Sequence, residues 1–348
     1  MLVGAYITLN VRHLYVIDMR AYMKIKQAKK LSLLVIAMGF SCFAMAQQEP
    51  QFTQYMFSRM AYNPGYAGSS GSICLTALYR NQWMGFTIDP PASGKAGSVP
   101  VDILATFDMP VKFLHGGIGL TFTNDKIGYW TNNVVNLDYA FRMFWGEGNL
   151  AAGVEANLAS KSLNKDGLVG IDENDPVLSK IAESAFLIDV SVGAYYQVPS
   201  KYWIGLSVKN LLGAHDDNMH WQNARTAYLM GGYEYAPDMA PSIRLKPSFM
   251  LKTADLSIFQ GEITGIVDYR NKVWGGISYR VQDAICVLGG VRWKKQHIGF
   301  AYDMTTSNLG TYKLGRSFGT LEAYLRFCFK VVVPAKPGTS YGNTIWLL

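Results

Sequence analysis

Residues 135–143 read Val-Asn-Leu-Asp-Tyr-Ala-Phe-Arg-Met, so a large apolar side chain stands at every second position. A period of two places alternate side chains on opposite faces of a β-strand. The same alternation recurs at 115–123, 204–209, 243–252 and 321–329. A soluble β-sandwich would also alternate, but its outward face would be polar and nothing would require this apolar and aromatic density. The pattern therefore favours an antiparallel β-barrel whose apolar face meets lipid.

A short leader precedes the alternating segments. A basic patch at 24–30 is followed by an apolar run at 31–43 and by Ala44-Met45-Ala46, the small-x-small pattern of a signal-peptidase site. The run is shorter than the roughly twenty residues that a membrane-spanning helix needs. We therefore expect residues 1–46 to be a signal peptide and the mature chain to begin at Gln47. Since signal peptides begin close to their basic region, Met23 is the expected initiator, after an over-extended start.

Export without a long apolar helix narrows the fold class, because lipid tolerates only helices or closed barrels across its core. We expect an all-β, antiparallel transmembrane barrel of about fourteen strands in the outer membrane of a Gram-negative bacterium. The expected strands cover 72–84, 98–108, 115–124, 129–144, 149–161, 184–198, 202–210, 225–236, 242–253, 256–270, 272–282, 284–293, 296–305 and 317–330.

The strand positions also predict the topology and the division of the chain. If the N-terminus starts in the periplasm, the longer connections at 85–97, 162–183, 211–224 and 306–316 face outward and the remaining ones are mostly tight periplasmic turns. The expected parts of the chain are the signal peptide at 1–46, an N-terminal aromatic segment at 47–71, the barrel at 72–330 and a C-terminal tail at 331–348.

Net charge says little about partners once the leader is removed. The full chain has a formal charge of +7, but the leader holds six Lys and Arg residues and one acid. The mature chain keeps 26 basic and 24 acidic side chains, a net charge of +2. The basic character of the full chain therefore does not indicate a nucleic-acid partner.

Cysteine usage predicts no special chemistry. A lipoprotein signal ending at Cys42 is the alternative to peptidase cleavage, but positions 39–41 lack the usual Leu three residues before the Cys. Cys74, Cys286 and Cys328 remain in the mature chain, and an odd number cannot all pair internally. No Cys-x-x-Cys or zinc spacing occurs. We expect three strand thiols that behave as small apolar residues rather than a functional disulfide.

The polar face of the predicted strands carries charges of both signs. The inward-facing set is Arg80, Asp138, Arg142, Glu155, Lys161, Asp189, Lys209, Arg244, Lys246, Lys252, Glu262, Asp268, Arg270, Arg280, Arg292, Asp303, Glu322 and Arg326. Each would cost about 2–4 kcal/mol if it faced hydrocarbon near the midplane, so these side chains line the lumen. Mixed signs favour a cross-linked lumen or a docking surface, with an aqueous pore as the alternative. We expect Arg80, Arg142, Arg280 and Asp303 to form a lumen ion-pair network.

The most distinctive sequence motifs lie at the start of the mature chain. Pro50-Gln-Phe-Thr-Gln-Tyr-Met-Phe57 leads through Tyr62-Asn-Pro-Gly-Tyr-Ala-Gly68 to Tyr79-Arg-Asn-Gln-Trp-Met-Gly-Phe86. Together they closely resemble the opening of the PorP/SprF family, outer-membrane components of the type IX secretion and gliding machinery. The resemblance extends over essentially the whole mature chain through motifs such as Trp274-Gly-Gly-Ile-Ser-Tyr-Arg280 and Gly299-Phe-Ala-Tyr-Asp303. One departure is residues 317–322, Ser-Phe-Gly-Thr-Leu-Glu, where the family commonly reads Gly-Ser-His-Glu.

The resemblance implies a non-enzymatic translocon partner. It implies a role in the secretion or surface anchoring of proteins, large adhesins among them, that carry a C-terminal sorting domain. The implied partners are the outer membrane, the periplasmic ring and trans-envelope motor proteins, and the secreted adhesin. A porin or transporter for small hydrophobic or polar solutes is the alternative function, and an outer-membrane hydrolase is a more distant one.

The N-terminal segment is too aromatic to stay loose in water. We expect its distinctive side chains either to plug the lumen or to bind a partner: Phe52, Gln54, Tyr55, Phe57, Tyr62, Asn63, Pro64 and Tyr66. An ordinary first hairpin followed by an Asn-Pro-Gly turn is the alternative.

The sequence offers few candidates for catalysis or metal binding. Residues 215–220, His-Asp-Asp-Asn-Met-His, cluster ligand-like groups but are better explained as a solvated outer loop. Residues 172–176 resemble part of a calcium loop but lack the Gly at its sixth position and the closing Glu. No G-x-S-x-G, phosphate-loop or dinucleotide motif occurs. We therefore expect no enzymatic activity, cofactor or metal.

Overall fold

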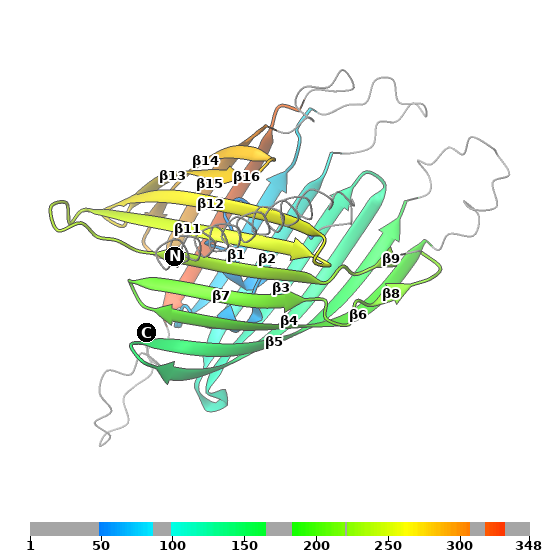
Figure 1. Cartoon of the computed structure of the whole chain (residues 1–348), viewed down its shortest axis with the longest axis horizontal. Coiled ribbons are helices and arrows are strands. Elements are labelled where there is room, and N and C mark those ends of the chain that lie inside the picture. The colour runs from blue at the N-terminus through cyan, green and yellow to red at the C-terminus, as the bar shows by residue number, and fades with distance from the viewer. Residues whose placement is uncertain (1–48, 86–98, 165–182, 220, 307–316, 331–348) are drawn as a thin grey trace, which may run out of the picture. The chain divides into compact units, whose positions relative to one another are not determined.

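The computed structural model describes residues 49–85, 99–164, 183–219, 221–306 and 317–330. They form a closed antiparallel barrel of fourteen strands (Figure 1). The expected signal peptide at 1–46 and the expected tail at 331–348 lie outside the described residues. The barrel strands are β1 (Ser72–Asn81), β2 (Val101–Val111), β3 (Gly116–Ile127), β4 (Trp130–Trp145), β5 (Gly148–Leu163), β6 (Ser184–Val198), β7 (Tyr202–Lys209), β10 (Thr226–Tyr233), β11 (Ile243–Ala254), β12 (Ile258–Tyr269), β13 (Val273–Arg280), β14 (Ala284–Trp293), β15 (Gln296–Thr305) and β16 (Thr320–Lys330).

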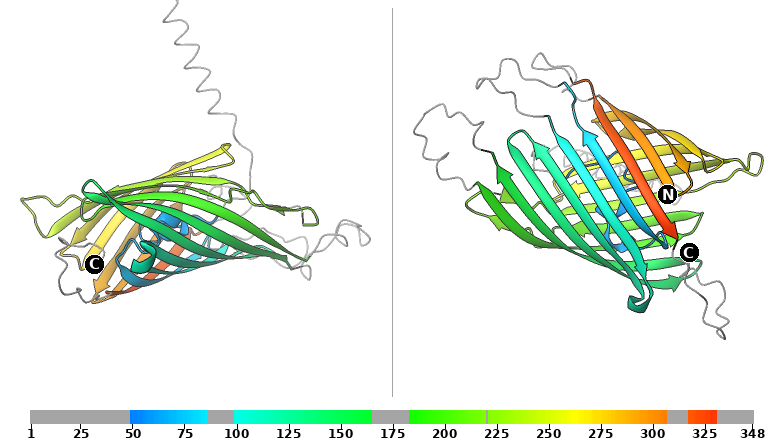
Figure 2. Two further views of the ribbon diagram at one scale, coloured as in Figure 1. Left: turned by 90° about the horizontal axis from the view of Figure 1, so that it is seen from below. Right: turned by 180° about the vertical axis from the view of Figure 1, so that it is seen from behind.

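Each strand pairs with its neighbour along the chain, and β16 returns to pair with β1. The connection from β7 to β10 contains a separate two-stranded sheet of β8 (His215–Asp216) and β9 (Trp221–Gln222). In both views of Figure 2 the strands that form the wall are tilted, as the closure of a sheet into a barrel requires. The prediction of fourteen antiparallel strands is confirmed, and the boundaries agree to within a few residues. Among the described residues, no helix is long and apolar enough to cross a membrane.

Alternating burial along each strand separates the outer and inner faces of the wall. On β6, Phe186 and Ile188 are 59% and 57% exposed, whereas Asp189 and Ser191 are completely buried. The outward side chains are apolar because they face lipid, and the inward ones are polar because lipid excludes them. The alternation in the sequence therefore reports the two faces of the wall directly.

The lengths of the connections distinguish the two ends of the barrel. At one end, two to four residues link β2 to β3, β4 to β5, β6 to β7, β12 to β13 and β14 to β15, and nine residues link β10 to β11. At the other end, residues 82–100, 164–183, 210–225 and 306–319 form much longer connections, whereas two or three residues link β3 to β4, β11 to β12 and β13 to β14. Bacterial outer-membrane barrels keep short turns in the periplasm and longer loops outside. We therefore assign the short-turn end as the periplasmic end.

One of the predicted inward charges does not lie in the lumen. Arg270 follows the end of β12, has a positive φ of 52° and is exposed in the turn to β13. Its guanidinium lies 5.2 Å from the centre of the Tyr269 ring. The prediction for Arg270 was wrong because β12 ends one residue earlier than expected, which turns this side chain out of the wall. The other seventeen charges are buried or half-buried.

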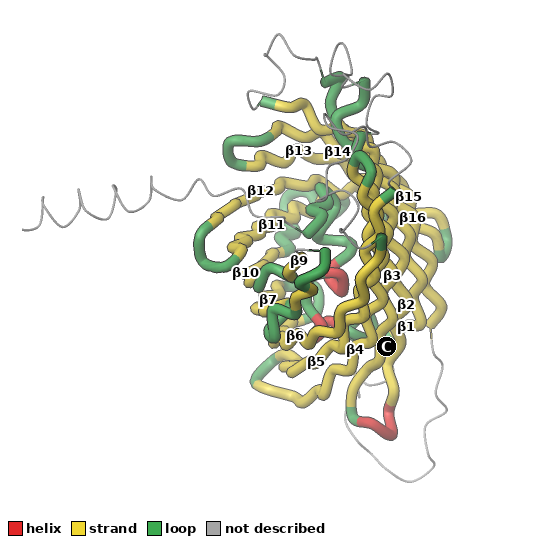
Figure 3. Tube along the Cα trace, turned by 90° about the vertical axis from the view of Figure 1, so that its right-hand side faces the viewer, coloured by secondary structure: helices red, strands yellow, loops and turns green. Residues whose placement is uncertain are grey.

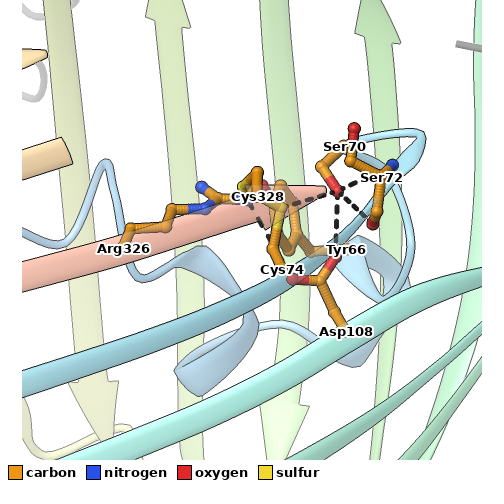
Figure 4. Close-up of a disulfide and its surroundings, with 7 residues drawn as sticks. All are labelled: Tyr66, Ser70, Ser72, Cys74, Asp108, Arg326 and Cys328. Carbon is orange, nitrogen blue, oxygen red and sulfur yellow. Dashed lines mark hydrogen bonds and ion pairs between the residues drawn. A yellow bond between two sulfur atoms is a disulfide. The ribbon is translucent and has the colours of Figure 1, made fainter. Parts of the chain in front are cut away.

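A disulfide joins the first and last strands, contrary to the expectation of three free thiols (Figure 4). Cys74 on β1 and Cys328 on β16 stand directly opposite each other, with Cα atoms 4.2 Å apart, although 254 positions separate them in the sequence. Only Cys286 is free among the described cysteines, and it is buried. An odd count does not exclude one pair, and the sequence carries no signal for the register in which distant strands meet.

The disulfide predicts a definite thiol count. The chain from Gln47 onward, denatured without a reductant, should react with one equivalent of maleimide, and the reduced chain should react with three. In the Cys74→Ser variant the count should be two with or without reductant. Three reactive thiols in the unreduced wild type would show that the bond is absent from the outer-membrane protein.

Candidate functional site

Residues 49–71, here called the lumen segment, run through the inside of the barrel. Figure 3 shows the two short 3-10 turns of this segment, η1 (Arg59–Ala61) and η2 (Pro64–Tyr66), within the ring of strands. Thr53, Gln54 and Tyr55 are fully buried, and Phe52 is 2% exposed. Turns within the segment satisfy part of its backbone, for example the Phe57 amide to the Gln54 carbonyl at 3.0 Å, and the remaining backbone groups need partners from the wall.

Glu322 on β16 binds the backbone of the lumen segment near its start. One carboxylate oxygen accepts the amide of Thr53 at 2.8 Å, and the other accepts the amide of Gln54 at 2.8 Å. The wall residue is completely buried, so both contacts are shielded from water. Charge-assisted hydrogen bonds of this kind are stronger than neutral ones. They fix the height at which the segment sits in the lumen.

A buried ion-pair network surrounds the same point. Arg280 Nε lies 2.9 Å from Glu262, and its Nη1 lies 3.4 Å from Asp303. Arg80 Nη2 lies 3.6 Å from the same Asp303 carboxylate. Thr53 of the lumen segment joins the network, because its hydroxyl donates to Asp303 at 2.7 Å and accepts from Arg280 at 3.0 Å. The structure thus brings together three of the four predicted network residues.

Arg142, the fourth predicted member, lies elsewhere. Its guanidinium donates to the carbonyl oxygens of Ala67 and Gly68, at 2.5 and 2.8 Å, and to the Ser69 hydroxyl at 3.0 Å. Arg142 therefore binds the backbone of the segment where it leaves the lumen toward β1. Periodicity identified its inward direction but not its height along the barrel axis, which separates it from Arg80 and Arg280.

Aromatic side chains of the segment pack against the wall between these two anchors. Phe52, Tyr55 and Tyr62 belong to one buried cluster with wall residues. The wall members are Leu78, Leu104, Tyr228, Met230, Met250, Ile266, Trp274, Leu288, Ala301 and Tyr324. Phe57 packs beside this cluster, with its ring centre 4.8 Å from that of Trp274 and 5.3 Å from that of Tyr324. These contacts exclude water from the middle of the lumen.

Two tyrosine hydroxyls of the segment are satisfied inside the barrel. Tyr62 accepts the amide of Phe52 at 2.8 Å, and Tyr55 donates to Ser248 on β11 at 3.1 Å. The Gln54 side chain is also fully buried but has no hydrogen-bond partner among the described residues.

The Asn-Pro-Gly turn of the segment lies against a row of small wall residues. Gly117, Ala140, Gly153, Gly193 and Ser207 are register neighbours across β3, β4, β5, β6 and β7. A Cβ atom on the third of these would lie 2.3 Å from the Gly65 amide nitrogen, and one on the fourth 2.2 Å from Asn63 Oδ1. The row is therefore a shallow groove, and at Gly153 and Gly193 only glycine leaves room for the turn.

Asn63 ties the turn to the groove. Its Nδ2 donates to the carbonyl of Ala194 at 3.0 Å, and its Oδ1 accepts the amide of Gly65 at 2.8 Å. Pro64 begins the following 3-10 turn, and Tyr66 packs edge-on against Tyr195 with ring centres 5.4 Å apart. All eight residues singled out in the N-terminal segment are thus in contact with the wall or close beside it.

The sequence did not single out several residues that hold the segment. Thr53 shows no feature in the sequence that marks it as a bridge between two charged groups. The wall glycines could have been noticed as small residues at inward positions of neighbouring strands. Glu49 was also missed: its carboxylate accepts from Asn210 at 2.8 Å and from Tyr228 at 3.0 Å, and Lys252 donates to its carbonyl at 2.7 Å.

The predicted loop candidates show no metal-binding arrangement where they can be assessed. Among the described residues, no group of three or more His, Cys, Asp and Glu side chains could hold a metal ion. His215 is exposed and lies 3.9 Å from the Asp217 carboxylate. His220 and residues 172–176 lie outside the described residues.

Replacing the buried arginines should destabilise the barrel. Arg280→Leu or Arg80→Leu leaves buried carboxylates without a partner, which costs roughly 3–5 kcal/mol. The exposed Arg270→Leu is the matched control and should change stability by less than about 1 kcal/mol. Unfolding midpoints in urea and heat-modifiable gel mobility measure the effect. Equal midpoints for all three variants would show that the network is a set of hydrated charges.

Filling the groove should displace the lumen segment from the wall. In the Gly153→Ala, Gly193→Ala double variant, the new methyl groups clash with Gly65 and Asn63, so the bond after Arg59 should become accessible to trypsin. Mass spectrometry of the folded, detergent-solubilised protein measures cleavage there. Gly265→Ala, at a position with no neighbour within 4 Å, is the control and should stay protected like the wild type. Protection in the double variant would mean that the turn does not depend on this groove.

Comparison with known proteins gives one family match. The profile of the type IX secretion system membrane protein PorP/SprF matches residues 44–327. No curated protein matches the chain significantly.

Several solved structures are similar at low identity. Omp33 of Acinetobacter baumannii is 8% identical, with a TM-score of 0.42 over 74% of this chain and 99% of that one. A mutant of the monoaromatic hydrocarbon channel TodX is 11% identical, with a TM-score of 0.46 over 80% and 94%. The monoaromatic hydrocarbon channel CymD is 11% identical, with a TM-score of 0.41 over 82% and 95%.

The family match spans four-fifths of the sequence and ends within the last strand of a closed fourteen-stranded barrel. The chain belongs to the PorP/SprF family of type IX secretion system membrane proteins, in the bacterial outer membrane.

Proposed function

We propose that this protein is a non-enzymatic component of the type IX secretion and gliding machinery. In this proposal it supports the secretion or surface anchoring of proteins with a C-terminal sorting domain. It does so in association with the periplasmic ring and the trans-envelope motor proteins. Family membership supports the assignment of the protein to the type IX machinery. The geometry of the lumen supports a scaffolding role within that machinery.

The observation that carries this proposal is the occupied lumen. Glu322 holds the start of the lumen segment, the aromatic cluster holds its middle, and Arg142 holds its end. A barrel whose interior binds its own chain at three heights is suited to present loops and turns to partners at both membrane surfaces. A porin for small solutes needs a continuous aqueous path, and the aromatic cluster lies across that path.

Deletion of the gene tests the proposed function in cells. A subset of proteins bearing the sorting domain should accumulate in the periplasm while the outer membrane remains intact, and a plasmid copy of the gene should restore surface delivery. Fractionation followed by quantitative mass spectrometry measures both. Normal surface delivery of every such protein in the null strain would refute the proposal.

Removal of the lumen segment separates the scaffold from the porin alternative. A variant that keeps the leader but lacks residues 49–62 should assemble, because every barrel strand remains, and it should conduct more current in planar bilayers than the wild type. The wild type should pass little current. A wild type that already conducts as well as the deletion variant would favour the porin, since the segment would then not obstruct the lumen.

A further inference from the structure

The periplasmic end of the lumen is much more basic than the rest of the interior. A cavity of about 240 Å³ at this end is lined by the cationic side chains of Arg59, Lys201, Lys246, Arg292 and Arg326 and by one carboxylate, that of Glu234. Opposite charges elsewhere in the lumen are more evenly matched. The outer cavity of about 280 Å³ is lined by two carboxylates, Glu49 and Asp125, and two ammonium groups, Lys161 and Lys209.

A second cavity adjoins the first and adds to the positive charge. It has a volume of about 360 Å³, shares Gln197 as a lining residue, and is bordered by Lys112, Arg142 and Lys330 without any carboxylate. Together the two cavities, here called the basic mouth, draw their cations from η3 (Lys112–Leu114), the lumen segment and several wall strands. The charge is therefore distributed around the mouth.

Several of these cations lack an acidic partner in the barrel. Four cations of the first cavity do have such a partner. Lys246 (at 3.0 Å) and Arg292 are both paired with Asp268, Lys201 is paired with Glu147 at 2.6 Å, and Arg326 with Asp108 at 4.0 Å. Within the part of the chain that the structure describes, Arg59, Arg142, Lys112 and Lys330 form no ion pair with any carboxylate. The guanidinium of Arg59 instead bonds the Tyr195 hydroxyl at 2.8 Å and lies 4.1 Å from the centre of the Trp203 ring.

We propose that the basic mouth is a docking site for an acidic protein segment that approaches from the periplasm. This inference rests on the proposed function, because the segment would belong to a periplasmic partner in the same machinery. A peptide fits better than a single small anion for two reasons. The cations come from many elements, so a ligand with several carboxylates can meet more of them, and the walls also offer apolar surface at Phe57, Val198 and Trp203. Complementary charge of this kind raises association rates and selects partners.

Binding of a defined peptide to the purified full-length mature protein tests the proposal. The probe is a fluorescein-labelled octapeptide of alternating Glu and Leu, and the comparison peptide has Gln in place of Glu. Fluorescence anisotropy at low salt should show the acidic peptide binding at least about tenfold more tightly, and the difference should shrink as salt is added. Equal affinity for the two peptides would overturn the proposal.

Reversing the charge of two lysines tests whether the acidic peptide binds at the basic mouth. The double variant Lys112→Glu, Lys330→Glu changes two exposed side chains. It should lower the affinity for the acidic peptide by about tenfold. Lys126→Glu is the matched control, because Lys126 is also exposed but lies near the end of β3 that is farther from the basic mouth, and it should change affinity less than about twofold. The same loss in the control, or no loss in the double variant, would overturn the assignment. Displacement of the peptide by inorganic phosphate, at an ionic strength where chloride does not displace it, would indicate a small-anion site instead.

Expression of the double variant in the null strain distinguishes this inference from the proposed function. Export of sorting-domain proteins should fall relative to the Lys126→Glu strain. Normal export by the double variant, with a clear defect in the null strain, would overturn the docking role and leave the proposed function standing. Normal export in the null strain itself would overturn the proposed function.

Discussion

The pairing of β1 with β16 is the constraint on which the rest of the structure depends. Hydrocarbon offers no partner to a backbone N–H or C=O group, so a sheet can cross the membrane only if its two edges bond to each other. Closure fixes which side chains face lipid and which face inward. Once the ring is closed, every polar side chain on the wall is confined to an interior that must satisfy it.

The lumen segment resolves that requirement by supplying both polar partners and apolar volume. The amides of Thr53 and Gln54 give the buried Glu322 carboxylate two donors, and the Thr53 hydroxyl bridges Asp303 and Arg280. The aromatic rings of the segment fill space that wall side chains alone would leave to water. Conversely, the wall gives the segment the backbone partners that it could not find within itself. Each part therefore depends on the other for its satisfied hydrogen bonds.

Sequence reasoning succeeded where the physical signal is local and failed where it is not. Alternation at 135–143 and elsewhere predicts strands and faces, because the period of a strand is a property of a few consecutive residues. Arg142 lies outside the predicted ion-pair network because alternation gives the direction of a side chain but not its position along the barrel axis. The Cys74–Cys328 bond depends on a register between strands at opposite ends of the chain. The groove that receives the Asn63-Pro64-Gly65 turn depends on glycines from several strands, which become neighbours only in the folded sheet.

The position of the lumen segment also has a consequence for how the protein is built. The segment is joined directly to β1, and the ring around it is completed only when β16, the last strand of the barrel, pairs with β1. The wall can therefore close over a segment that is already lying on the inner faces of the early strands, so nothing has to be threaded through a finished cylinder. The groove of small residues belongs to β3–β7 alone, so its formation does not require the contact between β16 and β1. The Cys74–Cys328 bond then forms only between strands that have met, and it records covalently that assembly has reached its final step.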